Sequence, residues 1–437
     1  MSRQPTGIIN IPPCRRRLLL LALLATLPAL AGTRGGVHDP VFERLKVAEW
    51  GAAGQARMKW SAEVQPPELS THQRMILRVI TKIDGRELEK RRGKGEFFTL
   101  VQITDETGKL WQAHESIDLS ALESNLINRE FFVTQYAFVK AGNYSVTVAV
   151  CDGNNLDHSF VTRRVHVDAL KDDPLPHAFD GLPTVEFVPG TDGVPDVWFI
   201  PDIQSRLNLA PQTKRRIELQ ILVNTTPSER SMGSASTLRR NMALVIPAMK
   251  VFSGINLPNG TVDIAFLDLE LRKVVFEQTV VKQPDWYGMS KVFTSKNPGM
   301  VDIRTLTNEW KMSGYFLDEV SRRMNAPVAE DTVRVVIVLS GPAFFDGMKE
   351  NVSELPVGAD SRRLFYIRCR TLPVRYPRRN RPGVTPVPQR PVTVNTPMPA
   401  DDLERAATAL NGKVYDAAST EQFRRILAII LGQIADL

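Results

Sequence analysis

The stretch Ile217 to Ser228, IELQILVNTTPS, decides how the second half of this chain folds. Its first seven residues are mostly apolar, and such a short run is typical of a strand that is covered on both faces of a parallel sheet. Oxygen-bearing side chains then occupy every second position: Asn224, Thr226 and Ser228. A strand, a polar loop and a helix form the front edge of an α/β domain, where ligands usually sit.

Strand and helix patterns alternate downstream of this stretch. The expected elements are a helix at 235–252, strands at 261–267 and 273–281, a helix around 306–324, strands at 333–339 and 364–369, and a closing helix at 420–437. The strand at 273–281 is expected at a sheet edge. Strands that alternate with helices predict a doubly wound, mainly parallel sheet with helices on both faces. We assign this α/β domain to residues 213–437.

The first half of the chain has a different pattern. Short strands are expected at 75–80, 97–104, 109–114, 130–139, 144–150 and 160–167. Residues 144–150 alternate strictly between two faces, and turn signals recur about every ten residues. This pattern predicts an antiparallel β-sandwich over residues 61–170, and therefore a multidomain chain. Residues 32–60 are expected as a loose leader with one short helix, and residues 171–212 as a linker.

The N-terminus is typical of a signal peptide. Three arginines at 15–17 precede an apolar run from Leu18 to Leu30, and a small-x-small cleavage pattern ends at Ala31. The alternative, a membrane anchor, would need a longer run. Removing residues 1–31 removes four arginines and no acid, which lowers the net charge from +7 to +3. We therefore expect a periplasmic or secreted protein with no transmembrane segment in the mature chain and no nucleic-acid partner.

Catalytic signatures are sparse in this sequence. All six histidines precede residue 178, so the α/β domain holds no internal Ser-His-Asp triad, and no G-x-S-x-G or phosphate-loop motif occurs. The two cysteines that remain after residue 31, Cys151 and Cys369, fall in different predicted domains and are expected as free, buried thiols. These observations favour a non-enzymatic protein.

An arginine- and proline-rich stretch follows the strand at 364–369. Nine arginines lie between 362 and 390, and we expect a long loop at 370–399. Long loops inside a domain are usually functional or disordered. Arg375, Arg378, Arg379 and Arg381 are candidates for docking an acidic partner or an anionic surface. The alternative is a solvated insertion of polyproline-like character.

The order of elements resembles a von Willebrand factor type A domain. The resemblance rests on Ile217 to Phe252 and on the tail at 403–426, with its short helix, glycine, aromatic-bearing strand and closing helix. In the first half, Ala141 to Val148 is similar to the penultimate strand of immunoglobulin-like and fibronectin-type domains. Bacterial secreted proteins that join a β-sandwich to a von Willebrand factor type A domain match this layout.

The resemblance to this family raises the possibility of a divalent-cation site at the carboxyl edge of the sheet. Family members often hold a divalent cation through an Asp-x-Ser-x-Ser loop and a second aspartate after a later strand. Here Asn224 stands in place of the first aspartate and Ser340 in place of the second. Because a hard cation needs oxygen ligands with at least one carboxylate, we expect no metal and no other cofactor. Asp346 could supply a carboxylate for Mg²⁺ or Ca²⁺, but it lies six residues past Ser340, and the alternative is a solvated loop acid.

The sequence therefore predicts a protein-binding or adhesion-type function at the carboxyl edge of the sheet. The expected binding residues are Asn224, Thr226, Ser228 and Ser340. One alternative is a cell-envelope hydrolase that uses the arginine- and proline-rich loop as a lid. Another is a cation-dependent adhesion domain whose metal site is completed by the partner.

Overall fold

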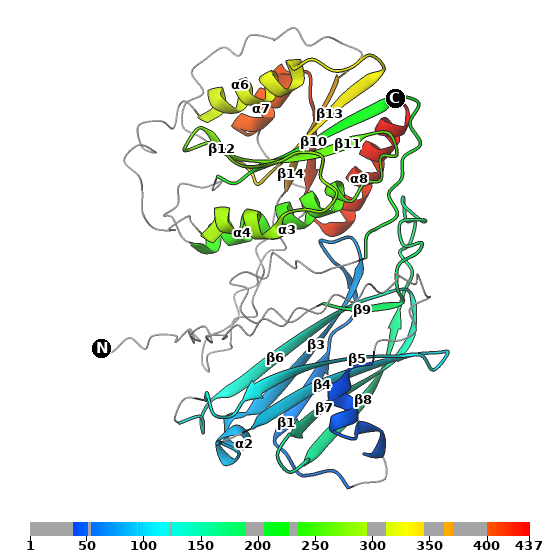
Figure 1. Ribbon diagram of the computed structural model, residues 1–437, viewed down its shortest axis with the longest axis vertical. Coiled ribbons are helices and arrows are strands. Elements are labelled where there is room, and N and C mark those ends of the chain that lie inside the picture. The colour runs from blue at the N-terminus through cyan, green and yellow to red at the C-terminus, as the bar shows by residue number, and fades with distance from the viewer. Residues whose placement is uncertain are drawn as a thin grey trace, which may run out of the picture.

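The computed structural model describes residues 38–50, 54–93, 95–122, 125–188, 205–226, 235–294, 312–344, 362–369 and 400–437. Figure 1 shows two antiparallel sheets in the N-terminal part of the chain and a third sheet, flanked by helices, in the C-terminal part. The third sheet is mainly parallel. The prediction of antiparallel strands followed by a mainly parallel sheet is confirmed at this level.

The two N-terminal sheets face each other, and we call them the N-terminal sandwich. One sheet has the order β1 (Trp60–Val64), β3 (Met75–Asp84), β6 (Glu130–Val139) and β9 (Val185–Phe187), with β2 (Glu68–Leu69) beside β3. The other has the order β5 (Leu110–Asp118), β4 (Glu96–Asp105), β7 (Gly142–Asp152) and β8 (His158–Val167). Side chains of both sheets form one hydrophobic core, which includes Leu77 and Val79 from the first and Val146 and Val148 from the second.

The leader was expected to be loose, but its described residues pack on the sandwich. It forms α1 (Pro40–Arg44) and a 3-10 turn, η1 (Val47–Glu49). Phe42 and Trp50 bury Ala149 and Cys151 on the outer face of β7. The predicted alternation of β7 therefore holds at its start but is replaced by burial on both faces from Val148 onward. A short helix, α2 (Gly85–Lys90), follows β3.

The third sheet, which we call the C-terminal sheet, has the order β12-β11-β10-β13-β14-β15. Its strands are β10 (Arg216–Asn224), β11 (Thr261–Asp268), β12 (Lys273–Gln278), β13 (Thr332–Ser340), β14 (Arg362–Cys369) and β15 (Lys413–Ala417). Only β12, at the edge, is antiparallel to its neighbour, as predicted for this stretch. Counted in chain order from β10, the strands lie 3-2-1-4-5-6, so the order reverses between β10 and β13.

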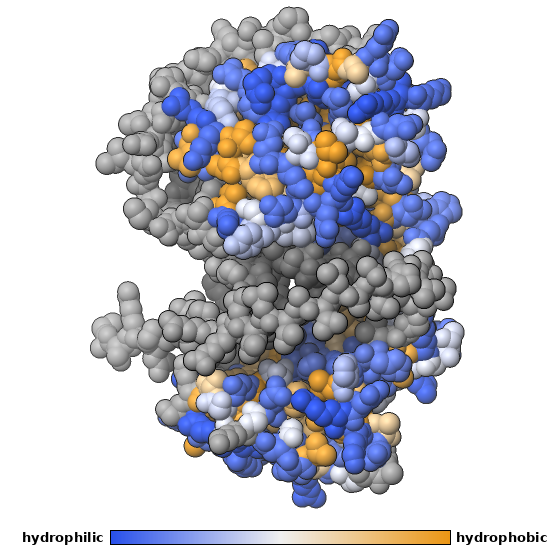
Figure 2. All heavy atoms as spheres, viewed as in Figure 1, coloured by the Kyte–Doolittle hydropathy of each residue, from blue (hydrophilic) through white to orange (hydrophobic). Residues whose placement is uncertain are grey.

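Helices cover both faces of the C-terminal sheet (Figure 1). On one face lie α3 (Ala235–Ser253), α4 (Trp286–Thr294) and α8 (Thr420–Ala435), and on the other lie α6 (Met312–Asn325) and α7 (Asp402–Ala409). Ile221 packs in the first layer and Leu222 in the second, which explains why the run in β10 is apolar at successive positions. In the view of Figure 2, hydrophilic side chains predominate on the outside of both parts.

The described residues of the expected linker pack against both the N-terminal sandwich and the C-terminal part. Strand β9 pairs with β6, and Ala178 and Leu209 are buried in the core of the C-terminal sheet. Arg424 of α8 forms two hydrogen bonds to the carboxylate of Asp173, at 2.6 and 2.8 Å, and lies over the ring of Phe179. These contacts join the two parts through specific, largely buried interactions.

Candidate functional site at the carboxyl edge of the C-terminal sheet

Two predicted site residues meet where the strand order reverses. Asn224 ends β10 and Ser340 ends β13, and these strands are parallel neighbours. Nδ2 of Asn224 donates a hydrogen bond to Oγ of Ser340 over 2.9 Å. In open α/β sheets, ligands bind outside the carboxyl ends of the strands at this reversal point. The contact therefore lies at the position where a ligand site is expected.

Thr226 fixes the loop that leaves β10. Its backbone N–H donates to Oδ1 of Asn224 over 2.9 Å, and its hydroxyl accepts the N–H of Leu269 over 2.8 Å. The loop is thereby held against the carboxyl end of β11. Asn224, Thr226 and Ser340 are at most 4% exposed. Their side chains therefore hold the strand ends in place through buried hydrogen bonds. The fourth predicted residue, Ser228, lies outside the described residues.

Tyr366 and Asp401 belong to the same edge and were not predicted as site residues. Tyr366, on β14, donates its hydroxyl to Oδ2 of Asp401 over 2.9 Å. Asp401 also accepts the N–H groups of Ala343 and Glu404, at 3.1 and 2.7 Å. Burial, followed by the charge of Asp401, raises the pKa of Tyr366 well above its ordinary value, so the phenol stays protonated. Burial also raises the pKa of Asp401, against these hydrogen bonds.

Arg368 compensates the carboxylates on this side of the edge. It forms ion pairs with Asp416 at 2.6 Å and with Glu404 at 2.8 Å, and its side chain is 3% exposed. Burial alone would lower the pKa of Arg368, but hydrogen bonding to Asp416 and the neighbouring carboxylates raise it. Arg368 is one of the nine arginines between 362 and 390, and it was predicted within the strand at 364–369. Its place in β14 is confirmed, and its burial and ion pairs set it apart from the candidate arginines of the loop.

The edge offers few oxygen atoms to a cation. Besides its contact with Asn224, the hydroxyl of Ser340 donates to the carbonyl of Gly341 over 2.6 Å, and no described histidine belongs to the C-terminal sheet or its helices. Asp268, at the end of β11, accepts the N–H of Leu271. Within the described ranges, no group of three or more His, Cys, Asp or Glu is arranged to hold a metal. A hard cation would have to displace existing hydrogen bonds at this edge.

Cys151 and Cys369 are free and buried, as predicted. Burial raises the pKa of each thiol to about 12. Because the thiolate is the reactive form, neither group is suited to act as a nucleophile at neutral pH.

The four candidate arginines, Arg375, Arg378, Arg379 and Arg381, lie outside the described residues, as does Asp346. Among the helices that the structure describes, none is long and apolar enough to cross a membrane.

No protein-family model matches the chain, and no curated protein is found to be similar to it. The function is therefore inferred from the residues at the carboxyl edge of the C-terminal sheet.

Proposed function

We propose that this chain is an exported, non-enzymatic binding protein that captures a protein partner at the carboxyl edge of its C-terminal sheet. The observation that supports this most is the contact between Asn224 and Ser340 at the reversal point of the strand order. Strands β10, β13 and β14 all end at this edge, and residues 227–234, 345–361 and 370–399, which lie outside the described residues, come after them in the sequence. Segments that follow the ends of strands commonly carry binding residues.

The charge of one segment favours an acidic partner. Residues 370–399 contain six arginines and no Asp or Glu. Because Arg pairs with carboxylates through two parallel hydrogen bonds, a segment of this composition suits an acidic protein surface. The buried network of Asn224, Ser340, Tyr366 and Asp401 would keep the ends of the strands fixed while the arginine-rich segment contacts the partner.

We also propose a fold type for each part of the chain. The strand order, the antiparallel edge strand β12 and the Asn-x-Thr-x-Ser loop support a von Willebrand factor type A-like fold without the acidic metal ligands. In the N-terminal sandwich, the hydroxyl of Tyr144 donates to the carbonyl of Lys140 over 2.9 Å. A buried tyrosine that closes a strand corner in this way supports an immunoglobulin-like sandwich.

The binding proposal is tested by removing charge at matched sites. One variant replaces the four candidate arginines, Arg375, Arg378, Arg379 and Arg381, with Gln. The control replaces four exposed cations with Gln, which removes the same charge. Three lie in the N-terminal part and one in the linker at 171–212, which we call the connector: Arg57, Arg163, Arg164 and Lys171. Capture of partners from a cell-envelope extract is quantified by mass spectrometry.

We expect an acidic partner that is bound by the wild type and by the control to be lost from the first variant. Equal capture by both variants would contradict a role for the arginine-rich segment. Retained capture in a variant with Asn224→Ala and Ser340→Ala, checked to be folded, would show that capture does not depend on the contact between these two residues.

A further inference from the structure

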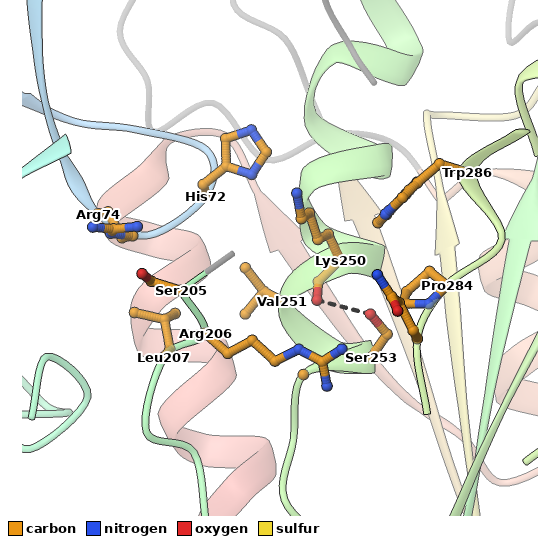
Figure 3. A pocket seen from close by; sticks show the side chains of 12 residues that line it. His72, Arg74, Ser205, Arg206, Leu207, Lys250, Val251, Ser253, Pro284 and Trp286 are labelled. Atoms are coloured by element: carbon orange, nitrogen blue, oxygen red, sulfur yellow. Dashed lines mark hydrogen bonds between the residues drawn. The ribbon is translucent and has the colours of Figure 1, made fainter. Parts of the chain in front are cut away.

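A cavity of about 120 Å³ lies where the N-terminal sandwich and the connector meet the C-terminal part. It is at the opposite end of the C-terminal sheet from the candidate site, because α3 starts beyond the carboxyl end of β10 and its last turn forms a wall of the cavity. Figure 3 shows Lys250 of α3 pointing toward His72, with Trp286 and Pro284 on the other side. The residues that line it are His72, Arg74, Ser205, Arg206, Leu207, Lys250, Val251, Ser253, Gly254, Gln283, Pro284 and Trp286.

Among the described residues of the lining, three are permanent cations and none is a carboxylate. Arg74 comes from the sandwich, Arg206 from the connector and Lys250 from α3. Arg74 is positioned firmly, because it is paired with Glu186 and lies over the ring of Phe138. Glu186 lies behind Arg74 and offsets its charge, and the guanidinium of Arg206 donates to the carbonyl of Lys282 over 3.0 Å.

The end of α3 and the ring of His72 also affect how well the cavity suits an anion. The carbonyl groups at the end of α3 disfavour an anion, but the hydroxyl of Ser253 donates to the carbonyl of Lys250 over 2.9 Å and partly compensates it. Burial, with the charges of Lys250 and Arg74, lowers the pKa of His72 to about 3. His72 is therefore a neutral imidazole at pH 7, which can donate or accept a hydrogen bond.

We propose that this cavity binds a phosphate group, either as the free ion or as a phosphate monoester. Arg206 and Lys250 would supply charge-assisted hydrogen bonds, and Arg74 would add a fixed positive charge behind them. The indole of Trp286, which lies under the Lys250 ammonium at 5.1 Å, and the ring of Pro284 form an apolar wall for the substituent of an ester. The cavity has room for one such group.

The proposed site differs from most surface anion sites because its cations come from separate parts of the chain. Arg74 follows β2 in the sandwich, whereas Lys250 belongs to a helix of the C-terminal part. A ligand held by both would stabilise the junction between them, since a ligand that binds only the native state raises stability by mass action. This inference does not depend on the proposed function at the carboxyl edge.

The test is isothermal titration calorimetry of the whole chain at constant ionic strength, with inorganic phosphate in one series and phenyl phosphate in the other. The variants are Arg206→Gln, at an exposed residue whose guanidinium donates to the carbonyl of Lys282, and Lys250→Gln, each checked to be folded. Arg163→Gln, an exposed change on β8, is the control for loss of one charge. The proton resonances of the His72 ring serve as a local reporter.

We expect saturable binding that weakens at least about tenfold in both cavity variants and is unchanged in the control, as loss of one charge-assisted hydrogen bond implies. The His72 resonances should shift on binding. Binding of phenyl phosphate alone would identify an ester ligand, and binding of both probes would identify a site that accepts the free ion. Absence of binding with both probes, or equal affinity in wild type, Arg206→Gln and Lys250→Gln, would overturn the proposal.

Discussion

At the scale of single residues, the carboxyl edge is a small set of buried polar groups that satisfy one another. Asn224, Ser340, Tyr366 and Asp401 each have a hydrogen-bond partner within the edge. A buried polar group that loses its partner costs about 1–3 kcal/mol. The edge is therefore sensitive to changes that remove one partner, even where the volume of the side chain is kept.

Tyr366→Phe is expected to lower the free energy of unfolding by about 1–3 kcal/mol, because Oδ2 of Asp401 loses a donor in a buried place. Urea unfolding followed by circular dichroism measures the change. Tyr287→Phe is the matched control, since that side chain is 72% exposed and should change stability little. If both changes had the same effect, the hydrogen bond from Tyr366 to Asp401 would contribute nothing measurable.

Divalent cations are expected to leave the unfolding midpoint unchanged. The described oxygen atoms of Asn224, Thr226 and Ser340 already take part in hydrogen bonds, and neutral ligands alone bind Mg²⁺ poorly. A thermal melt with chelator, then with millimolar Mg²⁺, Mn²⁺ or Ca²⁺, measures this. A rise with one cation that disappears in Ser340→Ala would contradict the expectation and favour cation-dependent adhesion.

At the scale of elements, the regular segments were the most predictable. The closing helix was predicted at 420–437, and α8 begins at Thr420. Ser419, followed three residues later by Gln422, is the sequence pattern of a capping box. Ser419 Oγ accepts the N–H of Gln422, and Oε1 of Gln422 accepts the N–H of Ala418. The capping residues are confirmed, although the return bond goes to Ala418 rather than to Ser419.

Ser419→Ala is expected to lower the free energy of unfolding by about 1 kcal/mol, whereas Ser419→Gly should cost only a few tenths, because glycine at this position exposes the helix end to water. Chemical denaturation of the three proteins gives both values. Equal losses for Ala and Gly would show that the hydroxyl does not cap α8 in solution.

The elements that sequence analysis missed are short or unpatterned. Helix α2 is six residues long and mostly charged, so it carries no apolar stripe. The polar pair Asp157–His158, next to the turn at 152–155, suggests a surface position from sequence. His158 is in fact buried and stacks on Trp50 at 4.3 Å, a contact made by residues far apart in the sequence. This interpretation was wrong because nothing near His158 indicates that the leader covers it.

The candidate site was predictable only in part, for the same reason. Asn224 and Ser340 could be found because each ends an apolar run, and polar residues at that point mark the end of a strand. Tyr366 and Arg368 lie inside β14, where their local pattern resembles that of any half-polar strand. Their partners, Asp401 and Asp416, are 35 and 48 residues away, and only the folded sheet brings them together.

At the scale of the whole molecule, the two parts are joined by Arg424. Besides Asp173, it contacts the carbonyl groups of Leu175 and Gln73, and Gln73 in turn donates to the carbonyl of Thr420. Burial alone would raise the pKa of Asp173, but its hydrogen bonds with Arg424 and Leu175 lower it below the ordinary value. A depressed carboxyl pKa contributes stability above the unfolded-state pKa, and this stability is lost as the pH falls through the folded-state pKa.

Asp173→Asn is therefore expected to lower the thermal midpoint at pH 7, with a loss of up to about 3 kcal/mol for a buried pair. The difference from wild type should shrink as the pH falls below the ordinary Asp pKa of 3.8. Asp172→Asn, an exposed neighbouring change, is the control. A difference that stays constant from pH 7 to pH 3 would show that the charge of Asp173 is not what stabilises the junction.

The two buried thiols have a practical consequence for measuring how this molecule opens. Cys151 lies in the N-terminal sandwich and Cys369 in the C-terminal sheet, so each reacts with an alkylating reagent only when its own part unfolds. Labelling followed by peptide mass analysis then times the two openings separately in one sample of unaltered protein. Equal labelling rates would mean that the chain unfolds as one cooperative unit, whereas unequal rates would rank the two parts by their resistance to opening.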